Sequence, residues 1–187
     1  TFKFFSPGVF MNKYVKRYCI DAMSGMAQGL FASLLIGTII RTLGQQLLRI
    51  WNSPVAEFLV SAGTFASDSH VVVAAMAVGI GFAMGVPSLV LFSLAAVGSA
   101  ANVTGGAGGP LAVLIIAVVA AEAGRLVSRK TKVDIIVTPA VTILAGAVLT
   151  VLTAEYIGDA ASSVGKFLVW TTKLHPFWMG ILVSLTV

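Results

Sequence analysis

Charged side chains are scarce in this sequence. Asp, Glu, Lys and Arg make up 10% of the 187 residues, whereas a soluble domain carries roughly 25%. Hydrophobic residues make up 58%, and the mean hydropathy is +0.99. A soluble domain of this length needs a polar exterior, and the chain has too few charges to make one. The composition therefore excludes an ordinary soluble domain and indicates a membrane protein.

Cysteine is nearly absent, since Cys19 is the single one in the sequence. A lone cysteine excludes a disulfide within the chain and a paired-cysteine metal motif. No GxGxxG pattern opens a helix after a strand, so no dinucleotide fingerprint is present. We therefore expect no metal and no cofactor. The net charge of +5 does not require a nucleic-acid partner, because basic residues beside a membrane attract anionic lipid headgroups.

What the sequence has instead is long uncharged runs. Ala22–Ile40 and Ile135–Ala154 contain no ionisable side chain, and His70 is the single titratable group from Ser69 to Ala121. About 20 apolar residues cross the hydrocarbon of a bilayer. The sequence therefore predicts an all-α membrane protein, a polytopic transmembrane helical bundle with about five or six spans. The expected crossings are Met23–Ile40, Val71–Gly85, Pro87–Ala101, Leu111–Leu126 and Ile135–Ala154.

The chain ends inside a further apolar run, Pro176–Val187, which is too short to span. We interpret residues 1–187 as one transmembrane domain, the N-terminal half of a longer one. Lys13, Lys16 and Arg17 precede the first apolar run, but no convincing cleavage site follows, so a removable signal peptide is not expected.

Basic residues near span ends predict the orientation. The first cluster lies just before the first span, and the densest cluster spans Arg125–Lys132. Both should face the cytoplasm, and the four crossings expected between them agree with that. Arg41 and Arg49 then fall outside, against the rule.

Prolines predict interruptions of the helices. Pro54 begins the segment Val55–Ser67, which is too short to cross and is expected to lie at the interface or dip partway into the membrane. Pro87 and Pro139 lie inside apolar runs, where a proline breaks or kinks a helix. Around Gly85-Val86-Pro87 two interpretations stay open: a broken or re-entrant helix that frees backbone groups for a solute, or a simple kink or tight hairpin.

Glycine is abundant. The pairs Gly25/Gly29 and Gly81/Gly85 place small residues one helical turn apart, which favours close helix packing in lipid. The run Gly105–Gly109 precedes Pro110 at an expected helix start. It is either a flexible connection or a loop whose free amides bind a hydroxyl group or an anion.

Few polar residues interrupt the apolar runs. Glu122 precedes Arg125 at helical spacing, which indicates either a local ion pair or a carboxylate that faces a cavity. Asp68-Ser69-His70 cannot form a hydrolase triad, because consecutive residues lack its geometry; they cap the next helix or bind solute. No catalytic residue is identified. The predicted solute site lies where the glycine run meets the broken Val71–Ala101 segments, with Glu122 close by; its candidates are Gly105, Gly106, Gly108, Glu122, Asp68, His70 and Asn102.

Three stretches carry a family resemblance. They are Lys130-Thr-Lys-Val-Asp-Ile-Ile-Val-Thr-Pro139, continuing to Gly146, the run Gly105–Gly124, and Trp170–Ser184. They resemble bacterial membrane proteins related to the sugar-transporting IIC component (EIIC) of the phosphoenolpyruvate phosphotransferase system, a family that includes perfringolysin (toxin) regulators.

The resemblance implies a multi-pass permease of the bacterial plasma membrane. Such a protein moves a sugar or a related small polar solute by alternating access, and it is expected to be a homodimer. No IIA or IIB phosphorylation domain is visible, so separate IIA and IIB phosphocarrier proteins would supply any phosphoryl group. The alternative function is a membrane-embedded regulator or sensor that binds a ligand without carrying it.

Overall fold

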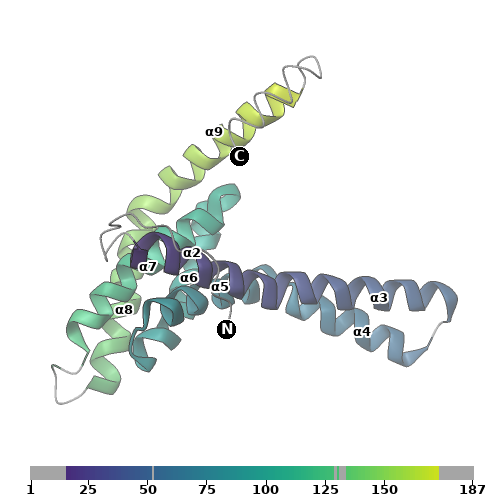
Figure 1. Ribbon diagram of the computed structural model, residues 1–187, viewed down its shortest axis with the longest axis horizontal. Helices are drawn as coiled ribbons and strands as arrows, with labels where there is room; N and C mark the ends of the chain where they lie inside the picture. The colour runs from purple at the N-terminus through teal and green to yellow at the C-terminus, as the bar shows by residue number, and fades with distance from the viewer. Residues whose placement is uncertain (1–15, 52, 129, 131–133, 173–187) are drawn as a thin grey trace, which may run out of the picture.

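The computed structural model describes residues 16–51, 53–128, 130 and 134–172. Every regular element in this part of the chain is a helix (Figure 1). In chain order the elements are η1 (Lys16–Asp21), α2 (Ala22–Leu30), η2 (Phe31–Leu35), α3 (Ile36–Ile50), α4 (Pro54–Ala66), α5 (Ser69–Met84), α6 (Ser88–Gly105), η3 (Gly106–Gly108), α7 (Gly109–Val127), α8 (Asp134–Leu149), η4 (Thr150–Ala154) and α9 (Glu155–Thr172).

The first four elements form one continuous helix, Lys16–Ile50. From Ala22 onward its buried residues are all small: Ala22, Gly25, Gly29, Ser33, Gly37 and Gly44. A Cβ atom on Gly25 would collide with the carbonyl oxygen of Gly79, and one on Gly29 with that of Ala75. The backbones of α2 and α5 are therefore in contact, as the Gly25/Gly29 spacing predicts. Large apolar side chains of this helix, such as Phe31, point outward.

Helix α4 begins at Pro54, as predicted, and packs along α3. Gly44 lies against Val60, and Gly63 lies against the backbone of Arg41, so the two helices run antiparallel. Together they form an arm that projects from the rest of the molecule (Figure 1).

The arm joins the bundle at a bend of 52° between α4 and α5. Such a bend frees backbone groups that need new partners. The hydroxyl of Ser33 donates to the carbonyl oxygen of Ala66 at 2.5 Å. The side chain of Asp68 accepts a hydrogen bond from the His70 amide at 2.9 Å, which confirms that Asp68 is the N-cap of α5.

The break predicted at Pro87 is confirmed, and it is a tight hairpin. Gly85 is left-handed, with φ 64°. Its amide bonds to the Phe82 carbonyl (3.0 Å) and the Val86 amide to the Gly81 carbonyl (3.2 Å), which is a Schellman motif. The spacing of Gly81 and Gly85 predicted that both pack against another helix. Gly85 instead forms the turn.

Pro139 gives a different result, because α8 runs through it without a break. The proline lies in the second turn of the described helix, so the one intrahelical hydrogen bond that it removes, to the carbonyl oxygen of Ile135, is close to the helix start. Buried threonines on the same helix satisfy their hydroxyl groups locally: Thr138 donates to Asp134, and Thr142 to the carbonyl oxygen of Thr138 at 2.8 Å.

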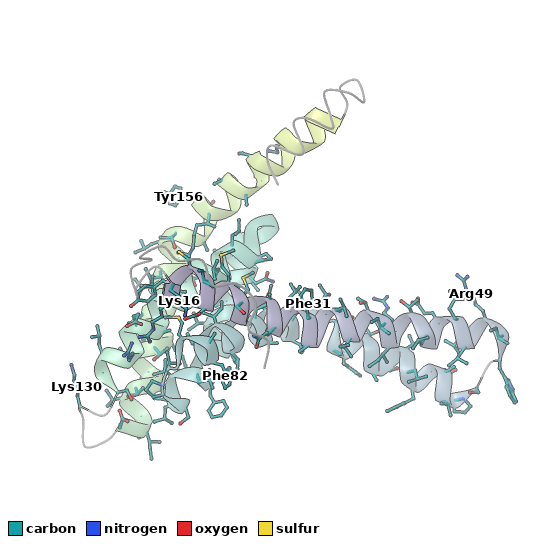
Figure 2. All side chains as sticks on the ribbon, viewed as in Figure 1. Lys16, Phe31, Arg49, Phe82, Lys130 and Tyr156 are labelled. Atoms are coloured by element: carbon teal, nitrogen blue, oxygen red, sulfur yellow. The ribbon has the colours of Figure 1, made fainter. Side chains whose placement is uncertain are left out.

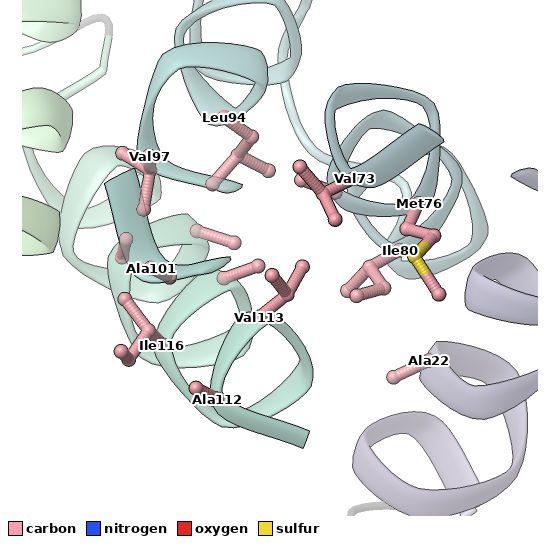
Figure 3. Packing of buried hydrophobic residues seen from close by; sticks show 14 of the residues in the cluster. Ala22, Val73, Met76, Ile80, Leu94, Val97, Ala101, Ala112, Val113 and Ile116 are labelled. Atoms are coloured by element: carbon pink, nitrogen blue, oxygen red, sulfur yellow. The ribbon is translucent and has the colours of Figure 1, made fainter. Parts of the chain in front are cut away.

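The core lies between α2, α5, α6 and α7 (Figure 3). Its largest fully buried side chains include Met76 and Ile80 of α5, Leu94 of α6 and Ile116 of α7. Helix α8 packs against α6 and α7. The lack of a side chain at Gly124 leaves room for Thr142, and the lack of one at Gly146 leaves room for Val97.

Four helices are long and apolar enough to cross a membrane: Lys16–Ile50, Ser88–Gly105, Gly109–Val127 and Asp134–Ser163. The bent pair of α4 and α5 makes a fifth if it is counted as one span. The all-α polytopic bundle is therefore confirmed. The expected apolar run Pro176–Val187 lies outside the described residues.

Candidate functional site

Polar side chains gather at two opposite ends of the bundle. The histidine end consists of Asp68, Ser69, His70, Ser99 and Asn102. The basic end consists of Arg17, Glu122 and Arg125 beside the Gly85–Pro87 turn. Helix α5 runs from Ser69 to Met84 between the two ends, a distance of about 22 Å at 1.5 Å per residue.

The histidine end links the first turn of α5 to the last turns of α6. Atom Nδ1 of His70 lies 3.0 Å from Oγ of Ser99, and the amide of Asn102 donates to Oγ of Ser69 at 2.9 Å. Ser99 and Asn102 are three residues apart, so they share the face of α6 that meets α5. His70 and Ser69 are exposed, and Ser99 and Asn102 are half-buried. Imidazole, amide, hydroxyl and carboxylate groups together offer the donors and acceptors that a hydroxyl-rich solute needs.

The glycine run lies at the same end, because Gly109 packs against the side chain of Asn102. It is a short helical turn, η3, and not an open loop. Gly105 and Gly108 are buried, and a Cβ on Gly108 would lie 2.8 Å from Cβ of Ala161 in α9. Gly106 is exposed, with φ 50° and open space beside it. The run therefore serves mainly to pack α9 closely, and Gly106 is its accessible member.

The basic end contains Glu122, which the sequence had grouped with the glycine run. Oε1 of Glu122 lies 3.5 Å from Nη1 of Arg125, so the local ion pair is confirmed. However, Gly109 and Glu122 are separated along α7 by about 20 Å at 1.5 Å per residue. The structure thus brings Asp68, His70, Asn102 and the glycine turn together and leaves Glu122 at the other end. The prediction that Glu122 lies close to the other candidate site residues is therefore wrong.

Arg17 is a partner of Glu122 that the sequence did not reveal. Its Nη2 atom lies 3.5 Å from Oε1 of Glu122 and donates to the carbonyl oxygen of Met84 at 2.8 Å. Both side chains are about three-quarters shielded from solvent, at 24% and 28% exposure. One sequence signal was compatible with this contact: the predicted orientation places Arg17 and Arg125 on the same side of the membrane.

Two open cavities flank this basic end. One, of about 380 Å³, is lined by Gly85, Val86, Pro87, Arg125 and Ser128. The other, of about 310 Å³, is lined by Lys16, Arg17, Asp21, Ala83 and Met84. Within the described ranges, no group of three His, Cys, Asp or Glu side chains is placed to hold a metal ion.

Comparison with known proteins agrees with this helical membrane architecture. The sequence model of the family described as "Phosphotransferase system, EIIC" matches residues 20–187, which covers the three resembling stretches noted in the sequence. No curated protein and no solved structure matches the chain. The match extends over most of the 187 residues, and the chain therefore belongs to the phosphotransferase system EIIC family, the membrane component of phosphotransferase sugar transport.

Proposed function

We propose that this protein is a permease that moves a carbohydrate, or a related small polar solute, across the bacterial plasma membrane by alternating access. Family membership supports the transport role. The observation that carries the location of the site is the network of the histidine end, in which Ser69 and His70 of α5 are hydrogen-bonded to Asn102 and Ser99 of α6.

The chemistry of this end suits a sugar. Polar side chains near the ends of apolar helices are costly in lipid, so they face water, protein or a solute. A sugar hydroxyl both donates and accepts, and His70 and Asn102 offer both functions at an exposed edge. The capping carboxylate of Asp68 and the exposed Gly106 turn lie at the same end.

Movement of helices against each other is supported by the packing of α2 on α5. Their interface contains close backbone contacts at small residues, between Gly25 and Gly79 and between Gly29 and Ala75. Discontinuous helices with a solute site between repeats are typical of secondary transporters. We infer that the α5–α6 hairpin and the long first helix shift relative to each other during transport.

The test is a sugar-dependent thermal shift of the purified protein. We expect one class of sugar to raise the melting temperature saturably, and His70→Ala and Asn102→Ala to weaken this binding at least tenfold. Thr104→Ala is the matched control, since Thr104 is exposed at the same end and bonds to its own helix. If both site variants fold and bind with wild-type affinity, the solute site is elsewhere.

A membrane-embedded regulator or sensor is the second candidate function. It is supported by the resemblance of Lys130–Gly146 to a family that includes toxin regulators. Both functions require ligand binding, but only a permease carries the solute. Uptake of the identified sugar into vesicles that contain the protein supports transport, whereas binding without uptake supports regulation.

The oligomeric state of the protein and its phosphocarrier partners also stay predictions. We expect a homodimer served by separate IIA and IIB phosphocarrier proteins. We also expect residues 1–187 to belong to one transmembrane domain.

A further inference from the structure

The turn between α5 and α6 forms one wall of an open cavity at the basic end, which has a volume of about 380 Å³. The lining residues come from this turn and from the end of α7: Gly85, Val86, Pro87, Arg125 and Ser128. Small-molecule sites occupy roughly 300–1,000 Å³, so the cavity is large enough for a small ligand or a lipid headgroup. The sugar site proposed at the histidine end lies at the opposite end of the bundle and does not use this cavity.

Arg125 brings positive charge to the cavity. Its side chain is exposed, and within the described part of the chain its one ion-pair partner is Glu122, whose Oε1 atom lies 3.5 Å from Nη1. The same Oε1 atom also lies 3.5 Å from Nη2 of Arg17. One carboxylate therefore faces two guanidinium groups, which leaves an excess of positive charge. The remaining N–H donors of Arg125 are available to a ligand, because a guanidinium carries several in a planar fork.

The start of α6 adds backbone donors to the same cavity. Pro87 is the N-cap residue of α6, and no side chain caps this helix, whereas Asp68 caps α5. The first amides of α6 therefore lack partners within their helix. A helix N-terminus carries the equivalent of about +0.5 charge. Together with the two arginines, this outweighs the negative charge of Glu122, so the cavity favours an anion.

Ser128 is the side chain that points to a ligand. It lies in the cavity wall and is only 9% exposed, yet its hydroxyl forms no hydrogen bond with any described residue. Buried hydroxyl groups normally have a partner. The other buried polar side chains in the described ranges all donate to a protein oxygen atom: Ser33, Ser93, Thr138, Thr142 and Thr150. A ligand with acceptor oxygens in the cavity would give Ser128 the partner that the protein does not supply.

This set of donors fits a phosphate group. An arginine binds phosphate oxygens in a bidentate manner, and the free amides of a helix N-terminus bind phosphates. We propose that the cavity is a phosphate site, in which Arg125, the Ser128 hydroxyl and the first amides of α6 donate hydrogen bonds to the phosphate oxygens.

The surroundings of the cavity favour an anionic phospholipid as the source of this phosphate. Phe82, one turn before Gly85, and Leu126, next to Arg125, are both exposed. Figure 2 shows the side chain of Phe82 projecting from the bundle. In a membrane such residues contact acyl chains while the arginine meets the headgroup. A choline group would bring a cation toward the arginines, so phosphatidylglycerol should bind more tightly than phosphatidylcholine.

Native mass spectrometry of the full-length protein in detergent measures lipid binding. We expect phosphatidylglycerol to bind more tightly than phosphatidylcholine. Arg125→Gln and Ser128→Ala should each weaken phosphatidylglycerol binding about tenfold, because each removes a hydrogen bond to a charged group. Lys130→Gln is the matched control, since Lys130 is an exposed cation at the same end and does not line the cavity; its affinity should equal that of the wild type.

Inorganic phosphate tests a soluble source of the same chemistry. It is added at constant ionic strength to delipidated protein in detergent, and the melting temperature is compared with that after addition of phosphatidylglycerol. A rise with phosphatidylglycerol alone identifies the lipid as the source. A rise with inorganic phosphate that Ser128→Ala abolishes supports the site and assigns it to a soluble phosphate.

Three outcomes would overturn the proposal. Wild-type lipid affinity in folded Ser128→Ala protein, together with no response to inorganic phosphate, places no phosphate in this cavity; this small change keeps the test valid if Arg125→Gln fails to fold. Equal binding of phosphatidylglycerol and phosphatidylcholine shows that apolar contacts alone attract the lipid. An equal loss of affinity in Lys130→Gln and Arg125→Gln shows that the attraction is spread over the basic end and is not a site.

Discussion

Glu122 connects segments that are distant in sequence. Its Oε1 atom lies 3.5 Å from both Arg17 and Arg125, and Arg17 also reaches the carbonyl oxygen of Met84 at the end of α5. The carboxylate therefore connects the start of the first helix to α7. Because Nε of Arg17 is buried without a hydrogen-bond partner, the guanidinium depends on the contacts of its Nη2 atom. The structural role of Glu122 is thus to hold these helices together at the basic end.

We therefore predict that Glu122→Ala lowers stability while sugar binding at the histidine end is retained. With both side chains mostly shielded, the Arg17–Glu122 pair should contribute about 1–2 kcal/mol, between exposed and fully buried pairs. A double-mutant cycle of Arg17→Ala and Glu122→Ala, read by thermal melting in detergent, measures this coupling. The cycle of Arg125→Ala with Glu122→Ala is the control and should give about 0.3–0.5 kcal/mol, as for exposed helix pairs. Equal coupling in both cycles would contradict the assignment.

At the scale of helices, small residues decide which faces meet. In lipid no hydrophobic effect drives helices together, so close backbone approach supplies the attraction. The first helix follows this rule along its length, with buried small residues from Ala22 to Gly44. Its large apolar residues remain outside and are available to contact lipid.

Gly25→Leu should therefore destabilise the fold strongly. A side chain at position 25 collides with the backbone of Gly79 and with Ala83, and overpacking typically costs about 1–3 kcal/mol or more. Ser24→Leu is the matched control, since Ser24 is one residue away and exposed, and it should be neutral in a membrane. Expression as a monodisperse peak in detergent and the melting temperature are the readouts. Equal behaviour of the two variants would show that α2 does not pack on α5 at Gly25.

The helices could be predicted from the sequence more completely than the site. Uncharged runs and prolines predicted the spans, the start of α4 and the break at Pro87, because these signals are local. The proximity of Glu122 to the glycine run was predicted wrongly, because both lie on one helix and only its length separates them. The role of Gly108 in packing α9 was not apparent either, since it depends on a contact with Ala161, which is 53 positions further along the chain. A substitution such as Gly108→Val would therefore disturb this packing and is a poor probe of binding.

At the scale of the whole molecule, the two basic clusters lie at the same end. Arg17 contacts Glu122 on the helix that carries Arg125, and α2, α5, α6 and α7 pass alternately between the basic end and the histidine end. Four helices thus connect the two ends between the clusters, the same number as the crossings expected from the sequence. The positive-inside rule then assigns the basic end to the cytoplasm and the histidine end to the outside.

Cysteine labelling in intact cells tests this orientation. In a Cys19→Ser background, Thr104→Cys at the histidine end should react with an impermeant thiol reagent added outside. Lys130→Cys at the basic end should react only after the membrane is permeabilised. Both positions are exposed, so a difference in their labelling reports the side of the membrane. At Ser128, which is buried, a lack of labelling would report burial instead. Outside labelling of Lys130→Cys with protection of Thr104→Cys would invert the topology. It would also place the proposed sugar site and the α3–α4 arm on the cytoplasmic side, where Arg41 and Arg49 would obey the charge rule.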